Sequence, residues 1–214
     1  MFSSLHWDIF FTCASFLLLA VYHLYWVYLI RNKPLTTSTG ITNHLRGHWV
    51  QHIREERLDI LAVQTLRNWV MASSFLASTG ILICLGLLSV AASSQKIAEI
   101  TPSLSELVRG HRVFWLFKLM VLIIDFFFIF FSFCLAIRYF NHVNFMINVP
   151  STLAHKITPE YITKILNTGT MHYTMGMRGY YVAVLLFLWL FGPIWMLIGT
   201  VIMIIVLYHL DQRA

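Results

Sequence analysis

The sequence has few charged residues and few of the residues that interrupt helices. Charged residues make up 11% of its 214 residues and hydrophobic ones 58%, with only 5 prolines and 3 cysteines. About a quarter of the residues in a soluble globular domain are charged, so the composition excludes that class. The cysteines all fall in apolar stretches and predict no disulfide framework. We therefore expect most apolar side chains to face a lipid bilayer.

The apolar residues are gathered in long runs, at residues 9–30, 66–92, 113–138 and 179–208. A helix needs about 20 residues to cross the hydrocarbon core, and each run reaches that length. The runs are continuously apolar, whereas the strands of a membrane barrel alternate between two faces. The sequence thus predicts an all-α fold, an integral membrane bundle of four transmembrane helices that forms a single domain over residues 1–214.

Short amphipathic or interfacial helices are predicted between the spans, at residues 43–60, 103–109 and 159–166. In the first, Leu45, Trp49 and Ile53 recur every four residues, as in a helix that lies along a membrane surface. Each of the other two follows a Thr-Pro pair, which is typical of an N-cap with proline at the first helical position.

The net charge of +6 follows the predicted topology. Ten Lys and Arg residues follow spans one and three, and four lie beyond the opposite ends of the spans. The positive-inside rule then places loops one and three in the cytoplasm and both termini on the periplasmic side of a bacterial inner membrane. Because this distribution explains the charge, we expect no nucleic acid partner.

Several polar or helix-breaking residues fall inside the predicted spans, and we interpret them as an intramembrane polar layer: Asp125, Lys118, Ser74, Ser78 and Pro193. Proline at this position leaves the carbonyl of Trp189 without its helical donor, so that oxygen needs another partner. A carboxylate in the bilayer must be neutral or paired, and Lys118 lies on roughly the same helical face as Asp125. The layer is either a site for a proton or polar ligand or a packing contact that fixes helix register.

A second group of polar residues lies where the spans are predicted to reach the cytoplasm. It comprises His23, Gln64, Arg67, Asn68, Arg138, Asn141, His142 and Arg178. Such a ring of cations and amides can bind a phospholipid headgroup or another anionic ligand. Ordinary anchoring at the membrane surface is the alternative.

Histidines and methionines raise the question of a metal. His44, His48 and His52 recur at four-residue spacing, and Met171, His172 and Met175 offer soft ligands for copper. A b-type haem needs two facing histidines, and His23 has only His142 and His172 as distant candidates. No cysteine or carboxylate completes these patterns. We therefore expect no metal or haem cofactor, whereas a bound phospholipid fits the sequence.

Four stretches taken together are familiar: Leu61–Asn68, Arg138–His142, Asn144–Pro150 and Trp189–Trp195. From about Tyr22 to Asp211 the chain resembles a family of bacterial and plant membrane proteins that is catalogued as domain of unknown function 599. The resemblance implies a four-span architecture but no activity. It marks six of the cytoplasmic-face residues as motif positions, namely Gln64, Arg67, Asn68, Arg138, Asn141 and His142, and leaves out the histidine stripe and the methionines.

The sequence favours a non-enzymatic membrane protein, because its loops are too short for a catalytic domain and no nucleophile and base stand out. We expect an accessory subunit or a lipid-contacting scaffold whose partners are lipids and other membrane subunits, or further copies of itself. The alternative is a small transporter or proton-linked membrane enzyme that uses Asp125 and the cytoplasmic-side Arg and His residues. A metal or b-type haem carrier is the third hypothesis.

Overall fold

A computed structural model describes residues 2–93, 112–150 and 157–212, and these residues are almost entirely helical. The helices are α1 (Phe2–Asn32), a 3-10 turn η1 (Pro34–Thr36), α2 (Ser38–Glu55), α3 (Asp59–Ala92), α6 (Arg112–Ile147), α7 (Pro159–Phe191) and α8 (Pro193–Gln212). The predicted all-α class is confirmed. The expected helix at 103–109 lies outside the described residues.

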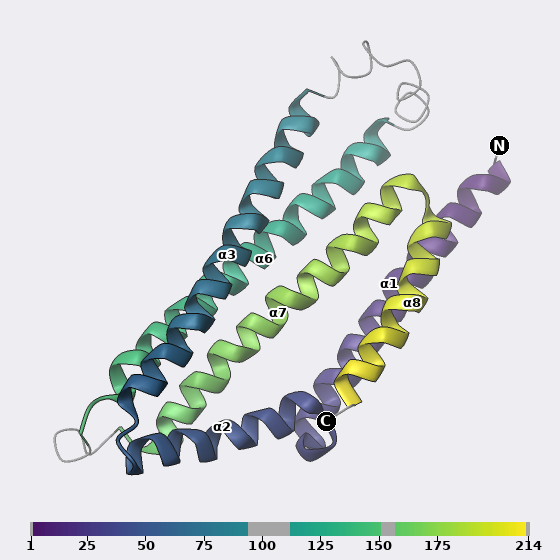
Figure 1. The fold of residues 1–214 in the computed structure, drawn as a ribbon. Coiled ribbons are helices and arrows are strands. Elements are labelled where there is room, and N and C mark those ends of the chain that lie inside the picture. Colours follow the sequence, from purple (N-terminus) through teal and green to yellow (C-terminus); the bar gives the residue numbers. More distant parts are fainter. Residues whose placement is uncertain (1, 94–111, 151–156, 213–214) are drawn as a thin grey trace.

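Five helices within the described ranges are long and apolar enough to cross a membrane, namely α1, α3, α6, α7 and α8. The expected count of four is therefore not confirmed. The difference arises at residues 179–208, where we predicted one span. The structure divides this stretch between the end of α7 and α8, which meet in a reversal of the chain (Figure 1).

Gly192 and Pro193 cause the reversal. Gly192 has a φ of 155°, which side chains with a Cβ rarely adopt. Pro193 has no N–H to continue the hydrogen-bonding pattern of α7, but its fixed φ suits the first position of the next helix. Pro193 is thus placed at the end of the bundle and not at mid-span.

The predicted short helix 159–166 is the beginning of α7. Its N-cap is confirmed, because the Thr158 hydroxyl accepts a hydrogen bond from the Tyr161 amide and Pro159 follows at the first position. The helix does not stop at Gly169, because that glycine is a packing position. A Cβ there would lie 3.0 Å from ring and Cβ atoms of Phe140 and Tyr139.

The helices form two groups that α2 connects (Figure 1). In one group α3, α6 and α7 lie side by side, and in the other α1 lies beside α8. The main apolar core joins α6 to α3 and α7 through residues such as Leu122, Ile129 and Phe133. A second core lies near α2 and contains Val50, Ile53 and Phe140 among its members.

Helix α2 is amphipathic as predicted, but its bounds and its buried face differ from those expected. It begins after the N-cap Thr37 and ends at Glu55 instead of residue 60. Arg57, with a φ of 53°, turns the chain into α3. Ile53 is buried as expected, but Val50 is its buried neighbour, whereas Leu45 is 58% exposed. The burial of Val50 and Ile53 orients α2 across the end of the bundle.

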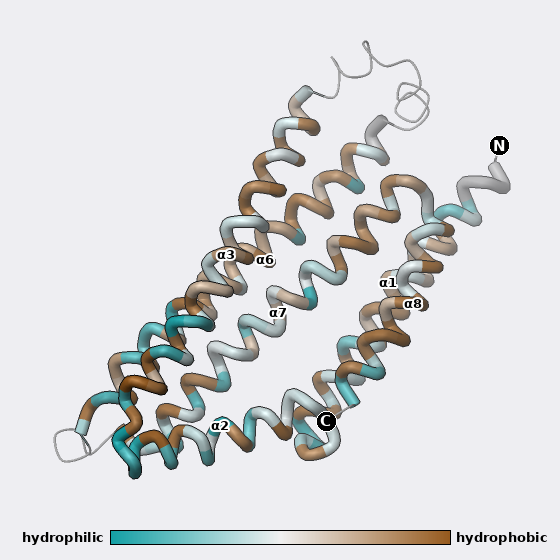
Figure 2. Tube along the Cα trace, in the orientation of Figure 1, coloured by the Kyte–Doolittle hydropathy of each residue, from teal (hydrophilic) through white to brown (hydrophobic). Residues whose placement is uncertain are grey.

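Several spans are also longer than their apolar runs. Helix α3 begins before residue 66, and α6 continues past residue 138 to Ile147. Hydrophilic residues gather at these ends and along α2, while apolar residues cover the rest of the helices (Figure 2). The outer faces are apolar, as shown by Phe75 at 74% and Phe131 at 59% exposure. This distribution is that of a membrane protein.

The two ends of the described chain lie at opposite ends of the bundle (Figure 1). Helix α1 starts far from α2, whereas α8 finishes beside it, where Ser38 Oγ donates a hydrogen bond to the Leu210 carbonyl at 3.2 Å. Five crossings would place these two ends on opposite sides of a membrane, whereas the expected four would place them on one side. The expected position of both termini on the outer side therefore stays a prediction.

Candidate functional site

An ion pair between Arg178 and Asp211 joins α7 to the end of α8. Arg178 Nη2 lies 2.7 Å from Asp211 Oδ1 and 2.6 Å from Oδ2, and the two side chains are only 6% and 17% exposed. The Tyr22 hydroxyl of α1 donates a 2.5 Å hydrogen bond to Asp211 Oδ2. Three helices thus meet at one carboxylate, and it is the only ion pair among the described residues.

Trp26 completes this buried site. The Arg178 guanidinium carbon lies 3.7 Å from the centroid of the Trp26 ring, so the two planar groups are in van der Waals contact. Trp26 is 2% exposed. Two buried donors at this site, Arg178 Nη1 and Trp26 Nε1, have no hydrogen-bond partner in the described part of the chain. We call Tyr22, Trp26, Arg178 and Asp211 the arginine site.

The sequence prediction included Arg178 but missed Asp211. A single helix over 179–208 places Asp211 on the opposite side of the membrane from Arg178, so a contact between them was excluded. The adjacent Gly192 and Pro193 were the signal that could have revealed the reversal, since Gly ends helices and Pro begins them. Tyr22 and Trp26 carry no such signal, because aromatic residues are common at membrane surfaces.

The cytoplasmic-face residues are divided between two places. Gln64, Arg67 and Asn68 of α3 and Arg138, Asn141 and His142 of α6 are all exposed. Their helices pack at this level, because the Trp69 and Phe140 rings lie 5.6 Å apart and Leu66 belongs to the same core. We call these six exposed residues the basic band. The structure places Arg178 and His23 elsewhere, near Asp211.

The side chains of the basic band are not engaged by other described residues. Within residues 2–93, 112–150 and 157–212, none of its six side chains makes a hydrogen bond or an ion pair. Their donors and charges are therefore open to the surroundings of the protein. A headgroup phosphate that approached this surface would not have to displace an existing contact.

The residues of the expected polar layer do not come together. Lys118 is buried, and its Nζ donates a 2.8 Å hydrogen bond to the Trp189 carbonyl. Lys118 is thus the new donor that this carbonyl was expected to need. Ser74 and Ser78 are exposed on α3, whereas their neighbours Ser73 and Ala77 are buried.

Asp125 remains a separate feature of α6. It makes no ion pair with Lys118, and its Oδ2 atom is buried without a hydrogen-bond partner among the described residues. Nearby, Gly80 of α3 lies against Ile129, and the Tyr180 hydroxyl of α7 donates a 2.6 Å bond to the Leu76 carbonyl. A carboxyl group in such a setting is stable in its neutral form.

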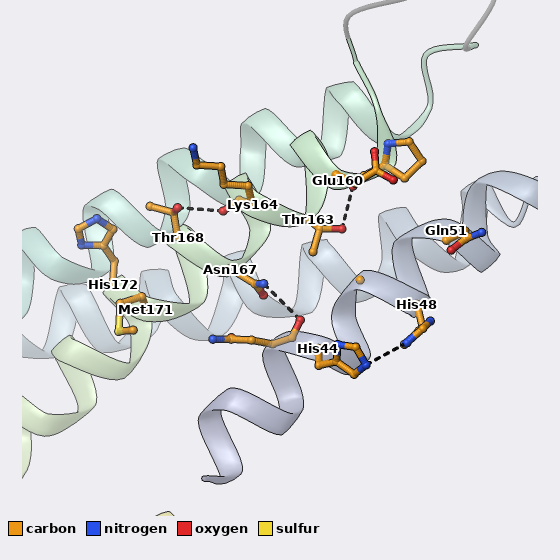
Figure 3. Close-up of a pocket in the computed structure, with 13 residues that line it drawn as sticks. His44, His48, Gln51, Glu160, Thr163, Lys164, Asn167, Thr168, Met171 and His172 are labelled. Carbon is orange, nitrogen blue, oxygen red and sulfur yellow. Dashed lines mark hydrogen bonds between the residues drawn. The ribbon is translucent and has the colours of Figure 1, made fainter. Parts of the chain in front are cut away.

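A groove of about 720 Å³ lies between α2 and the first half of α7 (Figure 3). It is lined by Asn43, His44, Gly47, His48, Gln51, Pro159, Glu160, Thr163, Lys164, Asn167, Thr168, Met171 and His172. Arg46 contacts two of these residues, since its Nη1 donates to Asn43 Oδ1 at 2.6 Å and to Asn167 Oδ1 at 3.3 Å. Burial lowers the pKa of Arg46 to about 10, so the side chain stays charged at neutral pH.

Four of the six candidate metal ligands, His44, His48, Met171 and His172, line this groove. The Nε2 atoms of His44 and His48 lie 3.2 Å apart, while Met171 and His172 lie on α7, away from that pair (Figure 3). His52 and Met175 do not line the groove. Across the described residues, no group of three or more His, Cys, Asp or Glu side chains is arranged to hold a metal ion.

The three histidines considered for the haem hypothesis have different surroundings. His23 Nδ1 is 2.8 Å from the Leu19 carbonyl, His142 is exposed on α6, and the His172 ring stacks on Tyr139 at 5.4 Å. Among the residues described, no contact joins His23 to either of the other two histidines. The described contacts thus do not join these three histidines in pairs.

These features define the class as a polytopic α-helical membrane protein with an exposed basic band and a buried arginine site. The chain belongs to the family described as "Protein of unknown function, DUF599", whose model matches residues 10–214. The family description assigns no activity, so the sites above rest on the structure alone. No curated protein and no solved structure matches the chain.

Proposed function

We propose that the protein is a lipid-contacting scaffold of the inner membrane that binds anionic phospholipid headgroups through its basic band. The exposure of Arg67 and Arg138 at one level of two neighbouring helices carries the proposal. Guanidinium groups bind phosphate oxygens in a bidentate way. Asn68, Asn141 and His142 add donors around the same headgroup.

The proposed orientation places α2 and the basic band at the cytoplasmic surface. Positive side chains concentrate at this end of the bundle, which favours the cytoplasmic side. Helix α2 buries Val50 and Ile53 against the bundle and exposes polar residues such as Gln51 and His52. With five crossings, the start of α1 then lies outside and the end of α8 inside. Anionic lipids of the inner leaflet are thus the available ligands.

Lipid titration into the purified protein, followed by native mass spectrometry, tests this proposal. We compare an anionic phospholipid with phosphatidylcholine, for the wild type and for Arg67→Gln/Arg138→Gln. The variant should bind the anionic lipid less tightly by at least about 3 kcal/mol, or more than about a hundredfold, because each lost hydrogen bond between a guanidinium and a phosphate contributes about 1.5–3 kcal/mol. Binding of phosphatidylcholine should change little.

A matched control removes the same charge elsewhere. Arg31 and Lys33 are exposed at the end of α1, so Arg31→Gln/Lys33→Gln lowers the net charge by the same two units. This control should retain most of the anionic preference. An equal loss in both double variants would reduce the effect to net charge and remove the basic band as a site.

A second function, proton-linked transport, is favoured by one observation: the Oδ2 atom of Asp125 is buried and has no hydrogen-bond partner in the part of the chain that the structure describes. A neutral carboxyl in a membrane bundle can exchange a proton with a passing ligand. The apolar reagent dicyclohexylcarbodiimide modifies protonated carboxyls inside membranes, so peptide mass spectrometry should find it on Asp125. Asp8 is exposed on α1, and Asp8→Asn should leave that labelling unchanged. Absence of the adduct from Asp125 would eliminate the transport hypothesis.

A further inference from the structure

We propose that Arg178 and Trp26 bind the carbonyl oxygen of a membrane lipid at the junction of α1, α7 and α8. This site is separate from the basic band, since Arg178 packs against α1 and α8 whereas the band lies on α3 and α6. Either proposal can therefore fail without the other. The inference starts from two N–H groups that meet no acceptor among the described residues.

The donors of the arginine site outnumber its acceptors. Nη2 of Arg178 is directed at both oxygens of Asp211, and the Tyr22 hydroxyl also donates to that carboxylate. Nη1 of Arg178 and Nε1 of Trp26 are buried and meet no acceptor in the described residues. A buried donor without a partner costs free energy, so two at one site indicate an acceptor beyond the described residues, and we assign that role to a lipid.

The two donors belong to side chains that are in direct contact. The central carbon of the guanidinium lies 3.7 Å from the centroid of the Trp26 ring. A carbonyl oxygen has two lone pairs and can accept from both.

The charge balance favours a neutral acceptor over an anion. The carboxylate of Asp211 already neutralises the charge of Arg178, with 2.6 Å between Nη2 and Oδ2. A phosphate or carboxylate added at this point would be a buried anion without a counter-charge, which is costly. Ester and quinone carbonyls are neutral and abundant in membranes, and both supply the same acceptor chemistry.

The depth of the site agrees with an ester carbonyl. Trp26 precedes the last residue of α1, Asn32, by six residues, or about 9 Å at 1.5 Å per residue. Asp211 is the penultimate residue of α8. The site thus lies where the hydrocarbon gives way to the headgroup region, which contains the ester groups of phospholipids. Leu24 and Tyr25 are exposed beside it and offer an apolar surface to an acyl chain.

The variant Trp26→Phe tests this inference with little disturbance. Phenylalanine keeps an aromatic ring against the guanidinium and removes the N–H. Trp195 is 58% exposed on α8, so Trp195→Phe is the matched control. After detergent exchange that removes loosely held lipid, we add back phospholipid labelled with ¹³C at the ester carbonyl. Infrared spectra then report hydrogen bonding to that carbonyl, and mass spectrometry quantifies retained lipids and quinones.

The wild type should retain about one phospholipid per protein, with part of the labelled carbonyl band at lower frequency. Trp26→Phe should lose the shifted band and retain at least fivefold less lipid, while Trp195→Phe behaves as the wild type. If Trp26→Phe does not fold, Arg178→Lys removes the Nη1 donor but keeps the charge opposite Asp211, and it should show the same loss.

If the wild type retains a quinone and Trp26→Phe loses it, the result would support the site and identify its ligand as a quinone and not a phospholipid. Two results would overturn the inference. One is a wild-type protein that retains no carbonyl compound and gives no shifted band on add-back, which leaves water as the acceptor. The other is retention and band position unchanged in both Trp26→Phe and Arg178→Lys.

Discussion

Lys118 Nζ donates a 2.8 Å hydrogen bond to the carbonyl oxygen of Trp189, and this contact ties α6 to the end of α7. Pro193 lies four residues after Trp189 and cannot supply the usual amide donor. The Lys118 ammonium also lies over the rings of Phe114 and Trp189, at 4.9 and 5.2 Å from their centroids. A buried cation thus stabilises the reversal that separates α7 from α8.

Replacing Lys118 by methionine should destabilise the protein. Methionine keeps the long side chain but leaves the Trp189 carbonyl without a donor, at a cost of about 1–3 kcal/mol. We expect Lys118→Met to unfold in detergent at a lower midpoint temperature than the wild type. Lys164→Met is the control, because Lys164 is exposed on α7. A midpoint that stays at the wild-type value for Lys118→Met would show that this hydrogen bond contributes nothing.

The arginine site should behave as a coupled pair. Asp211→Asn leaves Arg178 as a buried cation without its counter-ion and should cost about 3–5 kcal/mol. The double variant Arg178→Gln/Asp211→Asn removes both charges, so its loss should be smaller than the sum of the two single losses. A double-mutant cycle of unfolding free energies measures this coupling. Strictly additive losses would contradict a functional ion pair between α7 and α8.

Small residues set the distance between α6 and α7. A Cβ at Gly179 would lie 2.5 Å from Ile129 Cγ1, and one at Gly176 would lie 2.7 Å from the Phe133 ring. Gly179→Ala should therefore destabilise the bundle by about 1–3 kcal/mol through overpacking. Gly86 of α3 has open space around it, so Gly86→Ala should stabilise the helix by up to about 1 kcal/mol. Similar unfolding midpoints for the two variants would contradict this packing.

The sequence was sufficient for much of the fold. Long apolar runs predicted the all-α class, the Thr158 and Pro159 pair predicted a helix start, and the spacing in α2 predicted an amphipathic helix. These features depend on local chemistry, which a single chain segment contains. The requirement of the Trp189 carbonyl for a new donor was likewise a local consequence of Pro193.

The errors arose where local chemistry is ambiguous. The residues on both sides of Gly192 are apolar, so the reversal was hidden inside one apolar run, and Asp211 was placed on the side opposite to Arg178. From Trp69 onward α3 has apolar or small residues on every face, and the periodicity did not reveal that Ser73 and not Ser74 is buried. Both errors concern packing partners distant in the sequence.

The sidedness of Gln212 tests the fold most directly. We replace the three native cysteines and introduce single cysteines at His6, Leu35 or Gln212, all of which are exposed. A membrane-impermeant maleimide is then applied to intact cells and to inverted vesicles. Five crossings predict that Gln212→Cys is labelled from the same side as Leu35→Cys and from the side opposite to His6→Cys. Labelling of Gln212→Cys together with His6→Cys would restore an even number of crossings and separate Asp211 from Arg178.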